Sequence, residues 1–184
     1  MLAKRSRTER AFKRLSQLVQ DDPTERSLND LAVMAASPDA VQRLSALLVM
    51  RKQIDAGTPP ADFFDKARGL IADADNHCRW QALIVVGESI ESNPEAVWQV
   101  VREFGVSEDK DMRAGVATVL LEHLLQYHFD WCFPRLKEEI KGSGNSGLLL
   151  ADTLSACHAF GPAQERWQEV EALVRRSRRK KRAS

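Results

Sequence analysis

Three arginines recur along the chain at an almost constant spacing, and this repeat limits the possible fold more than any other feature of the sequence. Arg43, Arg79 and Arg113 are separated by 36 and 34 residues, and each has an aspartate four positions earlier. Each is also followed by small or apolar residues three, four and seven positions later. Such a period is typical of proteins that stack copies of one supersecondary unit.

The apolar pattern predicts helices along almost the whole chain. Apolar residues return every three or four positions, and no stretch shows the sustained alternation of a strand. Short segments rich in Gly, Pro, Asp and Ser interrupt the pattern and mark helix ends. We therefore expect an all-α protein with about ten helices. Their expected positions are near 7–20, 24–36, 39–55, 61–72, 76–91, 95–105, 109–126, 129–141, 146–160 and 163–177.

The repeated residues resemble the HEAT repeat pattern, in which two leucines and an aspartate are followed by an arginine and then by Ala and Leu at helical spacing. The segment 70–83 matches this pattern well. The segments 36–46 and 105–115 match less closely, and both have serine in place of the aspartate. The resemblance covers residues 24–126 and extends over 127–160 by helix length only. It implies a right-handed α-solenoid of stacked antiparallel helix pairs.

The resemblance also implies a domain organisation. We expect one HEAT-like solenoid domain over residues 1–177. Within it, 7–23 would be an N-terminal cap helix, 24–160 about four helix pairs, and 161–177 a C-terminal cap helix, because end repeats must cover the exposed core of their neighbours. The remaining residues, 178–184, are predicted to be a basic disordered tail.

The repeated polar residues have a structural interpretation, which we favour over ligand binding. An aspartate or serine at a turn can accept hydrogen bonds from the free backbone N–H groups of the next helix. The arginine fork can pair with acceptors in its own and the adjacent repeat. The predicted structural ladder consists of Arg43, Arg79, Arg113, Asp39, Asp73, Asp75 and Asp109.

A candidate protein-binding face follows from the resemblance, because the second helix of each pair lines the concave side of a solenoid. Polar residues two and nine positions after the ladder arginines lie off the apolar stripe. These residues are Ser45, Lys52, Gln81, Glu88 and Glu122. Glu88 and Glu122 would form an acidic stripe that accepts a basic or helical protein segment. The alternative is that both are simply solvated glutamates.

Charge is distributed unevenly, although 27 basic and 26 acidic residues give a net charge of only +1. Basic residues concentrate in 1–14 and 175–184, which leaves 14 basic and 25 acidic residues between them. Clustered Arg and Lys bind phosphate backbones by counterion release, whereas an acidic body repels them. The candidate nucleic-acid contacts are Arg175, Arg176, Arg178, Arg179, Lys180, Lys181 and Arg182. This end could instead be solvated, act as an import or anionic-surface signal, or fold back on the acidic body.

Residues suited to chemistry are few. The three cysteines are widely spaced and odd in number, which argues against a disulfide framework and fits a reducing compartment. His123, His128 and Cys132 would supply fewer than the four ligands of a structural zinc site. The glycine-rich segment 142–147 lacks the Lys-Ser/Thr end of a phosphate-binding loop. We expect no catalytic residue, no metal and no cofactor.

The sequence therefore predicts a non-catalytic HEAT-repeat scaffold that binds a protein partner through a concave, acidic face. The longest apolar stretch, 82–86, is far shorter than a membrane helix, and no signal segment is evident, so we expect a cytoplasmic protein. The alternative is a nucleic-acid-associated protein that uses its basic ends, for example a relative of the HEAT-like DNA alkylation-repair glycosylases. Trp80 with Asp130 or Asp152 would then be candidates for the site, although the acidic body argues against this function.

Overall fold

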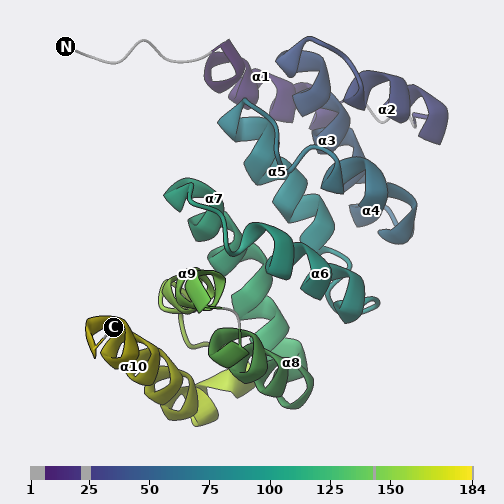
Figure 1. The fold of residues 1–184 in the computed structure, drawn as a ribbon. Coiled ribbons are helices and arrows are strands. Elements are labelled where there is room, and N and C mark those ends of the chain that lie inside the picture. The colour runs from purple at the N-terminus through teal and green to yellow at the C-terminus, as the bar shows by residue number, and fades with distance from the viewer. Residues whose placement is uncertain (1–6, 22–25, 143, 184) are drawn as a thin grey trace. The chain divides into compact units, whose positions relative to one another are not determined.

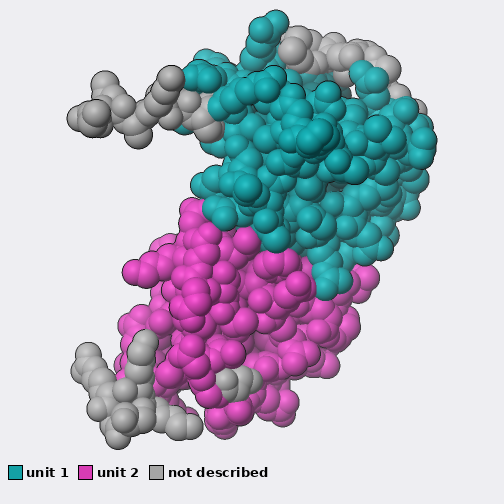
Figure 2. All heavy atoms as spheres, turned by 45° about the horizontal axis from the view of Figure 1, so that its top comes forward, with its two compact units in different colours: residues 1–89 teal, residues 90–184 magenta. Residues whose placement is uncertain are grey.

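The computed structural model describes residues 7–21, 26–142 and 144–183, without the side chains of 18, 20, 21 and 180–183. All regular elements in these residues are helices, which confirms the all-α prediction, and their number is close to the ten expected. The chain divides into two compact units, residues 1–89 and 90–184 (Figure 2). The sequence predicts a single domain, and the two units are described separately here.

The described helices of unit 1 form two layers (Figure 1). Helices α1 (Arg7–Asp21), α3 (Ala40–Asp55) and α5 (Asn76–Gly87) pack side by side in this order. Helices α2 (Leu28–Ala35) and α4 (Ala61–Arg68) pack against each other and cover α3 and α5, respectively. The side chains between the layers are almost completely buried, and the largest are Leu31, Leu44, Leu47, Met50, Phe63, Ile71 and Leu83.

Unit 2 begins with a helix that packs against a long, uneven second helix. Helix α6 (Pro94–Phe104) starts at its proline, a residue that suits the first helical position. Helix α7 (Lys110–Gly115) continues through a π-helical segment, η1 (Val116–Leu121), into α8 (Glu122–Gly142). The backbone of α8 is not helical at His128, where the chain bends. Two helices therefore meet at this residue, close to the predicted boundary between 109–126 and 129–141.

The end of unit 2 contains three further elements. Helix α9 (Gly144–Leu154) packs against both α8 and α10 (Trp167–Ala183), and a short 3-10 segment, η2 (Gly161–Arg166), precedes α10. Helix α9 ends six residues before the predicted end at residue 160. Helix α10 continues to Ala183, whereas the sequence analysis ends it at residue 177 and predicts disorder after it. Arg and Lys have high helix propensity, and no Gly or Pro interrupts this stretch.

The same helix cap occurs three times in the two units. Asp39, Asp75 and Asp109 are the N-cap residues of α3, α5 and α7. Each carboxylate accepts a hydrogen bond from the backbone N–H two positions later, at 3.0, 3.0 and 2.9 Å. The N–H of each aspartate donates to the side chain two positions earlier, at 3.1, 2.8 and 3.1 Å. The repeat seen in the sequence therefore corresponds to one recurring local geometry.

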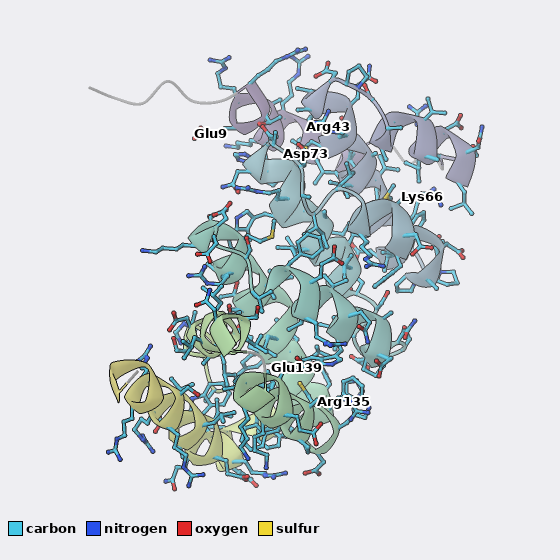
Figure 3. All side chains as sticks on the ribbon, in the orientation of Figure 1. Glu9, Arg43, Lys66, Asp73, Arg135 and Glu139 are labelled. Carbon is cyan, nitrogen blue, oxygen red and sulfur yellow. The ribbon has the colours of Figure 1, made fainter. Side chains whose placement is uncertain are left out.

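The arginines of the predicted ladder make related but unequal contacts, and Figure 3 labels Arg43 and its partner Asp73. Arg43 Nε and Nη2 donate to the two Asp73 carboxylate oxygens at 2.5 and 2.9 Å, and its Nη1 donates to the Ser37 carbonyl at 2.8 Å. Arg113 likewise donates to the carbonyl of Ser107, six residues earlier. Arg79 donates instead to the side chain of its neighbour Asn76. In the third copy of the repeat, Ser107 occupies the position that Asp73 holds in the second copy. Arg79 therefore has no equivalent carboxylate in the following copy.

Helix α9 approaches α8 most closely at a glycine. A Cβ placed on Gly147 would lie 2.6 Å from the Ile140 carbonyl oxygen and 3.1 Å from that of Glu139. The first distance is shorter than real Cβ contacts and the second is tighter than most of them, and the atoms met belong to backbone that cannot rotate away. Glycine at this position therefore sets the separation of the two helices.

We expect Gly147→Ala to lower the free energy of unfolding by about 1–3 kcal/mol, because the added methyl group forces the helices apart. Urea unfolding followed by circular dichroism measures this change. Gly142→Ala is the matched control, since a Cβ there meets nothing within 4 Å and alanine favours the helix. Equal stability of wild type and Gly147→Ala would contradict the close approach.

The second prediction concerns the Arg43–Asp73 pair, whose side chains are 16% and 5% exposed. Burial alone would raise the pKa of Asp73, but the hydrogen bonds from Arg43 and from the Asp75 N–H outweigh burial and lower it. A lowered folded-state pKa stabilises the protein above the unfolded-state value of about 4, and this contribution disappears as the pH falls through the folded-state pKa.

We expect Asp73→Asn to lower the free energy of unfolding at pH 7 by about 1–3 kcal/mol. Between about pH 5 and pH 2 the stability of wild type should fall more steeply than that of this variant. Urea titrations at a series of pH values test both statements, and Asp65→Asn, which removes an exposed carboxylate from α4, should follow wild type. If the free energy of unfolding changed with pH in the same way for wild type and Asp73→Asn, the Arg43–Asp73 pair would make no pH-dependent contribution to stability.

Candidate functional site

The residues of the predicted protein-binding face differ in exposure and in their contacts. Gln81 is buried, with 8% of its surface exposed, because α5 packs on several sides. The Lys52 ammonium donates to the Val19 carbonyl at the end of α1. Glu122 accepts a hydrogen bond from the His158 N–H at 2.9 Å. Gln81 is therefore not part of an exposed face, whereas Lys52 and Glu122 are half-buried, and their role in a binding face stays a prediction.

The two other residues of that face lie in unit 1. Ser45 is half-buried and donates to the Val41 carbonyl within its own helix, while Glu88 is exposed at the end of α5. Glu122 belongs to unit 2. The two glutamates of the predicted acidic stripe therefore belong to different units, and Glu88 is the one of the five predicted residues that is both acidic and exposed.

The predicted basic contacts lie on the surface of α10. Arg175, Arg176, Arg178 and Arg179 are exposed. Arg175 pairs with Glu171 at 3.1 Å, and Arg178 donates to the Ser155 hydroxyl at 2.9 Å. Helix α10 includes Lys180, Lys181 and Arg182, whose side chains lie outside the described part of the structure.

A groove in unit 2 is the strongest candidate for a functional site. It lies between α8 and α10, beside the first turns of α9, and has a volume of about 540 Å³. This volume is in the range of ligand-binding clefts. We call it the unit 2 groove, and its lining residues are Phe133, Lys137, Ile140, Lys141, Gly144, Leu148, Glu169, Ala172, Leu173, Arg176 and Ser177.

The groove combines apolar walls with a cationic rim. Helix α8 contributes Lys137 and Lys141, and helix α10 contributes Arg176. The Lys137 ammonium lies 4.8 Å from the centre of the Phe133 ring, which holds it beside the apolar wall. Lys141 and Arg176 are exposed. The local charge is therefore positive in a unit in which acidic residues outnumber basic ones before residue 175.

The one acidic residue of the lining, Glu169, forms an ion pair outside the lining. Glu169 accepts a hydrogen bond from Arg166 Nε at 2.7 Å, and this bond lowers the pKa of Glu169. Arg166 also pairs with Asp130 and stacks over the Phe129 ring at 4.2 Å. Glu169 thus shares Arg166 with Asp130, and the nearby charge of Lys137 also lowers the pKa of Glu169, while Lys141 and Arg176 add further positive charge to the rim.

Most of this site was missed in the sequence analysis. Arg176 was nominated, but only as part of a basic tail. Lys137 and Lys141 are four residues apart, a spacing that places two side chains on one face of a helix. Phe133 and Ile140 occupy the same face of α8, so a mixed apolar and cationic face was visible in the sequence. The helix that packs against this face, α10, could not be identified from the spacing of residues in the sequence.

The cysteines and histidines make no reactive cluster in the described residues. Cys78, Cys132 and Cys157 are free and buried. Burial is the main cause that raises the pKa of Cys78 and of Cys132 to about 12, and burial also raises that of Cys157. His128 Nε2 lies 2.9 Å from the Ile90 carbonyl oxygen, which makes it a hydrogen-bond partner at the bend of α8.

Among the residues that the structure describes, no group of three or more His, Cys, Asp or Glu side chains is placed to hold a metal ion. None of the described helices combines the length and the apolar character needed to span a bilayer. Comparison of the chain with family models, with curated proteins and with solved structures finds no match in any of the three.

We expect the three thiols of the folded protein to react very slowly with a disulfide reagent such as DTNB at pH 8. A thiol with a pKa of about 12, as for Cys78, holds roughly a thousandfold less thiolate than an ordinary cysteine. Absorbance during labelling, with and without denaturant, measures this protection. Ala156→Cys introduces a thiol at an exposed position and should react within the mixing period. Rapid labelling of wild type would contradict the burial.

Proposed function

We propose that this chain is a non-catalytic helical-repeat protein that acts by binding another protein. The unit 2 groove is the observation that carries the proposal. Its lining contains the half-buried apolar side chains of Leu148 and Ala172, together with the charged residues of the rim. Apolar patches surrounded by polar residues are typical of interaction sites on soluble proteins.

The HEAT-like architecture is part of the same proposal. The three equivalent aspartate caps support it, as does the two-layer packing of α1, α3 and α5 against α2 and α4 in unit 1. The Arg43–Asp73 contact supports it further, because it joins the starts of two successive copies of the unit. Repeat proteins of this kind provide extended surfaces for partners.

The side chains best suited to catalysis support a non-catalytic role. A nucleophilic cysteine needs a low pKa and access to solvent, whereas the three thiols here are buried and have raised pKa values. Asp130, a candidate for a glycosylase site, is 91% exposed and paired with Arg166. Asp152 is half-buried on α9, and Trp80 belongs to the other unit.

Association with nucleic acid is the alternative function, and one observation favours it. The exposed arginines of α10 form a cationic helical surface that can contact phosphates. The many acidic residues elsewhere in unit 2 would oppose binding of a duplex along its length. We therefore rank this function second.

Affinity capture with the tagged full chain, with and without nuclease treatment, separates the two functions. We expect protein partners that survive nuclease and that remain at about 150 mM salt, where exposed charge contacts are strongly screened. A truncation before residue 178 should keep these partners if the arginine-rich end is dispensable. Loss of all partners after nuclease treatment would favour the nucleic-acid function and contradict the proposal.

A further inference from the structure

We infer that the unit 2 groove binds an amphipathic helix from the partner protein, with an apolar stripe flanked by acidic residues. This inference rests on the proposed function and specifies its site and the chemistry of its partner. It depends on three properties of the groove, which are its shape, its apolar walls and the placement of its cations.

The shape of the groove suits a helix. Helices α8 and α10 both pack against α9, and the groove runs between them, with Leu148 of α9 and Ile140 of α8 in its lining. A channel between two helices that rest on a third can be filled by a fourth helix, as in a helical bundle. Partner helices in such grooves insert apolar residues at positions i, i+3, i+4 and i+7.

The apolar walls are part of the surface that such a helix would cover. Leu148 and Ala172 are half-buried, while Phe133, Ile140 and Leu173 are 3%, 9% and 7% exposed and supply the depth of the groove. Covering partly exposed apolar surface favours association. Since aliphatic residues dominate the walls, leucine-like side chains fit them better than a sugar-phosphate backbone does.

The cations of the groove specify an acidic partner. Lys137 and Lys141 are one helical turn apart on α8, and Arg176 lies on α10 across the groove. Acidic residues on both sides of a docked apolar stripe would therefore meet a cation on either wall. Helix α9 begins at Gly144 in the lining, so the positive end of its dipole adds to the same potential.

The test uses a fluorescein-labelled synthetic helix of about five turns, built from Leu, Ala and Glu. Leucines occupy one stripe and glutamates flank it on both sides. Fluorescence anisotropy with the full-length chain measures binding. We expect saturable binding that weakens as salt is raised, and weaker binding of a peptide with the same composition in scrambled order.

Two double variants with the same change in net charge locate the site. Lys141→Glu/Arg176→Glu reverses two exposed cations of the groove and should weaken binding by about tenfold or more, because acidic residues would then face each other. Arg51→Glu/Lys110→Glu reverses two exposed cations outside the groove and should change binding by less than about twofold. Circular dichroism and urea unfolding of both variants verify that each is folded.

Several results would overturn the inference. These are no binding of the acidic peptide by wild type, equal binding by the two double variants, and equal binding of the scrambled peptide. The inference would also fail if a labelled single-stranded oligonucleotide bound the groove more tightly than the peptide does. It would fail likewise if stoichiometric oleate displaced the peptide, because the groove would then bind a different class of ligand.

Affinity capture with the same variants distinguishes failure of this inference from failure of the proposed function. If wild type and Lys141→Glu/Arg176→Glu retain the same nuclease-resistant partners, the chain binds proteins at another surface and the groove assignment is wrong. If wild type retains none, the proposed function fails as well. If Lys141→Glu/Arg176→Glu loses a nuclease-resistant partner that Arg51→Glu/Lys110→Glu retains, the partner binds at the groove, as the inference expects.

Discussion

The start of each repeated helix depends on an aspartate that satisfies backbone N–H groups which the helix itself leaves free. In unit 1 this local interaction is joined to a longer one. Asp73 accepts the N–H of the cap residue Asp75 and also pairs with Arg43, 30 residues away in the sequence. The Thr8 hydroxyl of α1 donates to the second carboxylate oxygen of Asp75 at 2.5 Å. One connected set of hydrogen bonds thus fixes the beginnings of α3 and α5 and ties α1 to them.

The sequence predicts the features of this fold that are determined locally. Cap residues, prolines and apolar periodicity placed most helix ends within a few residues, and the repeat in the sequence matches a repeat of contacts at Asp39, Asp75 and Asp109. Features that depend on tertiary packing were not predictable in the same way. Gln81 looked like a surface residue because it lies off the apolar stripe, but α5 is covered on several sides.

The candidate site illustrates the same limit. The two lysines of α8 and the arginine of α10 are about 35 residues apart in the sequence, and no periodic pattern links them. They come together because α9 packs against both helices, and Gly147 permits its close approach to α8. The acidic face was inferred from equivalent positions in a repeat, without knowing which contacts Lys52 and Glu122 would make inside the fold. Charge alone was a poor guide, since the body of the chain is acidic whereas the groove is cationic.

Helix α10 forms one wall of the groove and is attached to unit 2 along a single side, through Val170, Leu173 and Val174. Its opposite side carries exposed arginines. A helix held along one side can detach while the other helices stay folded, so its amide protons can exchange through a local opening. One wall of the groove is therefore a helix that local opening can release, and a ligand bound in the groove would hold α10 against α8 and slow that exchange.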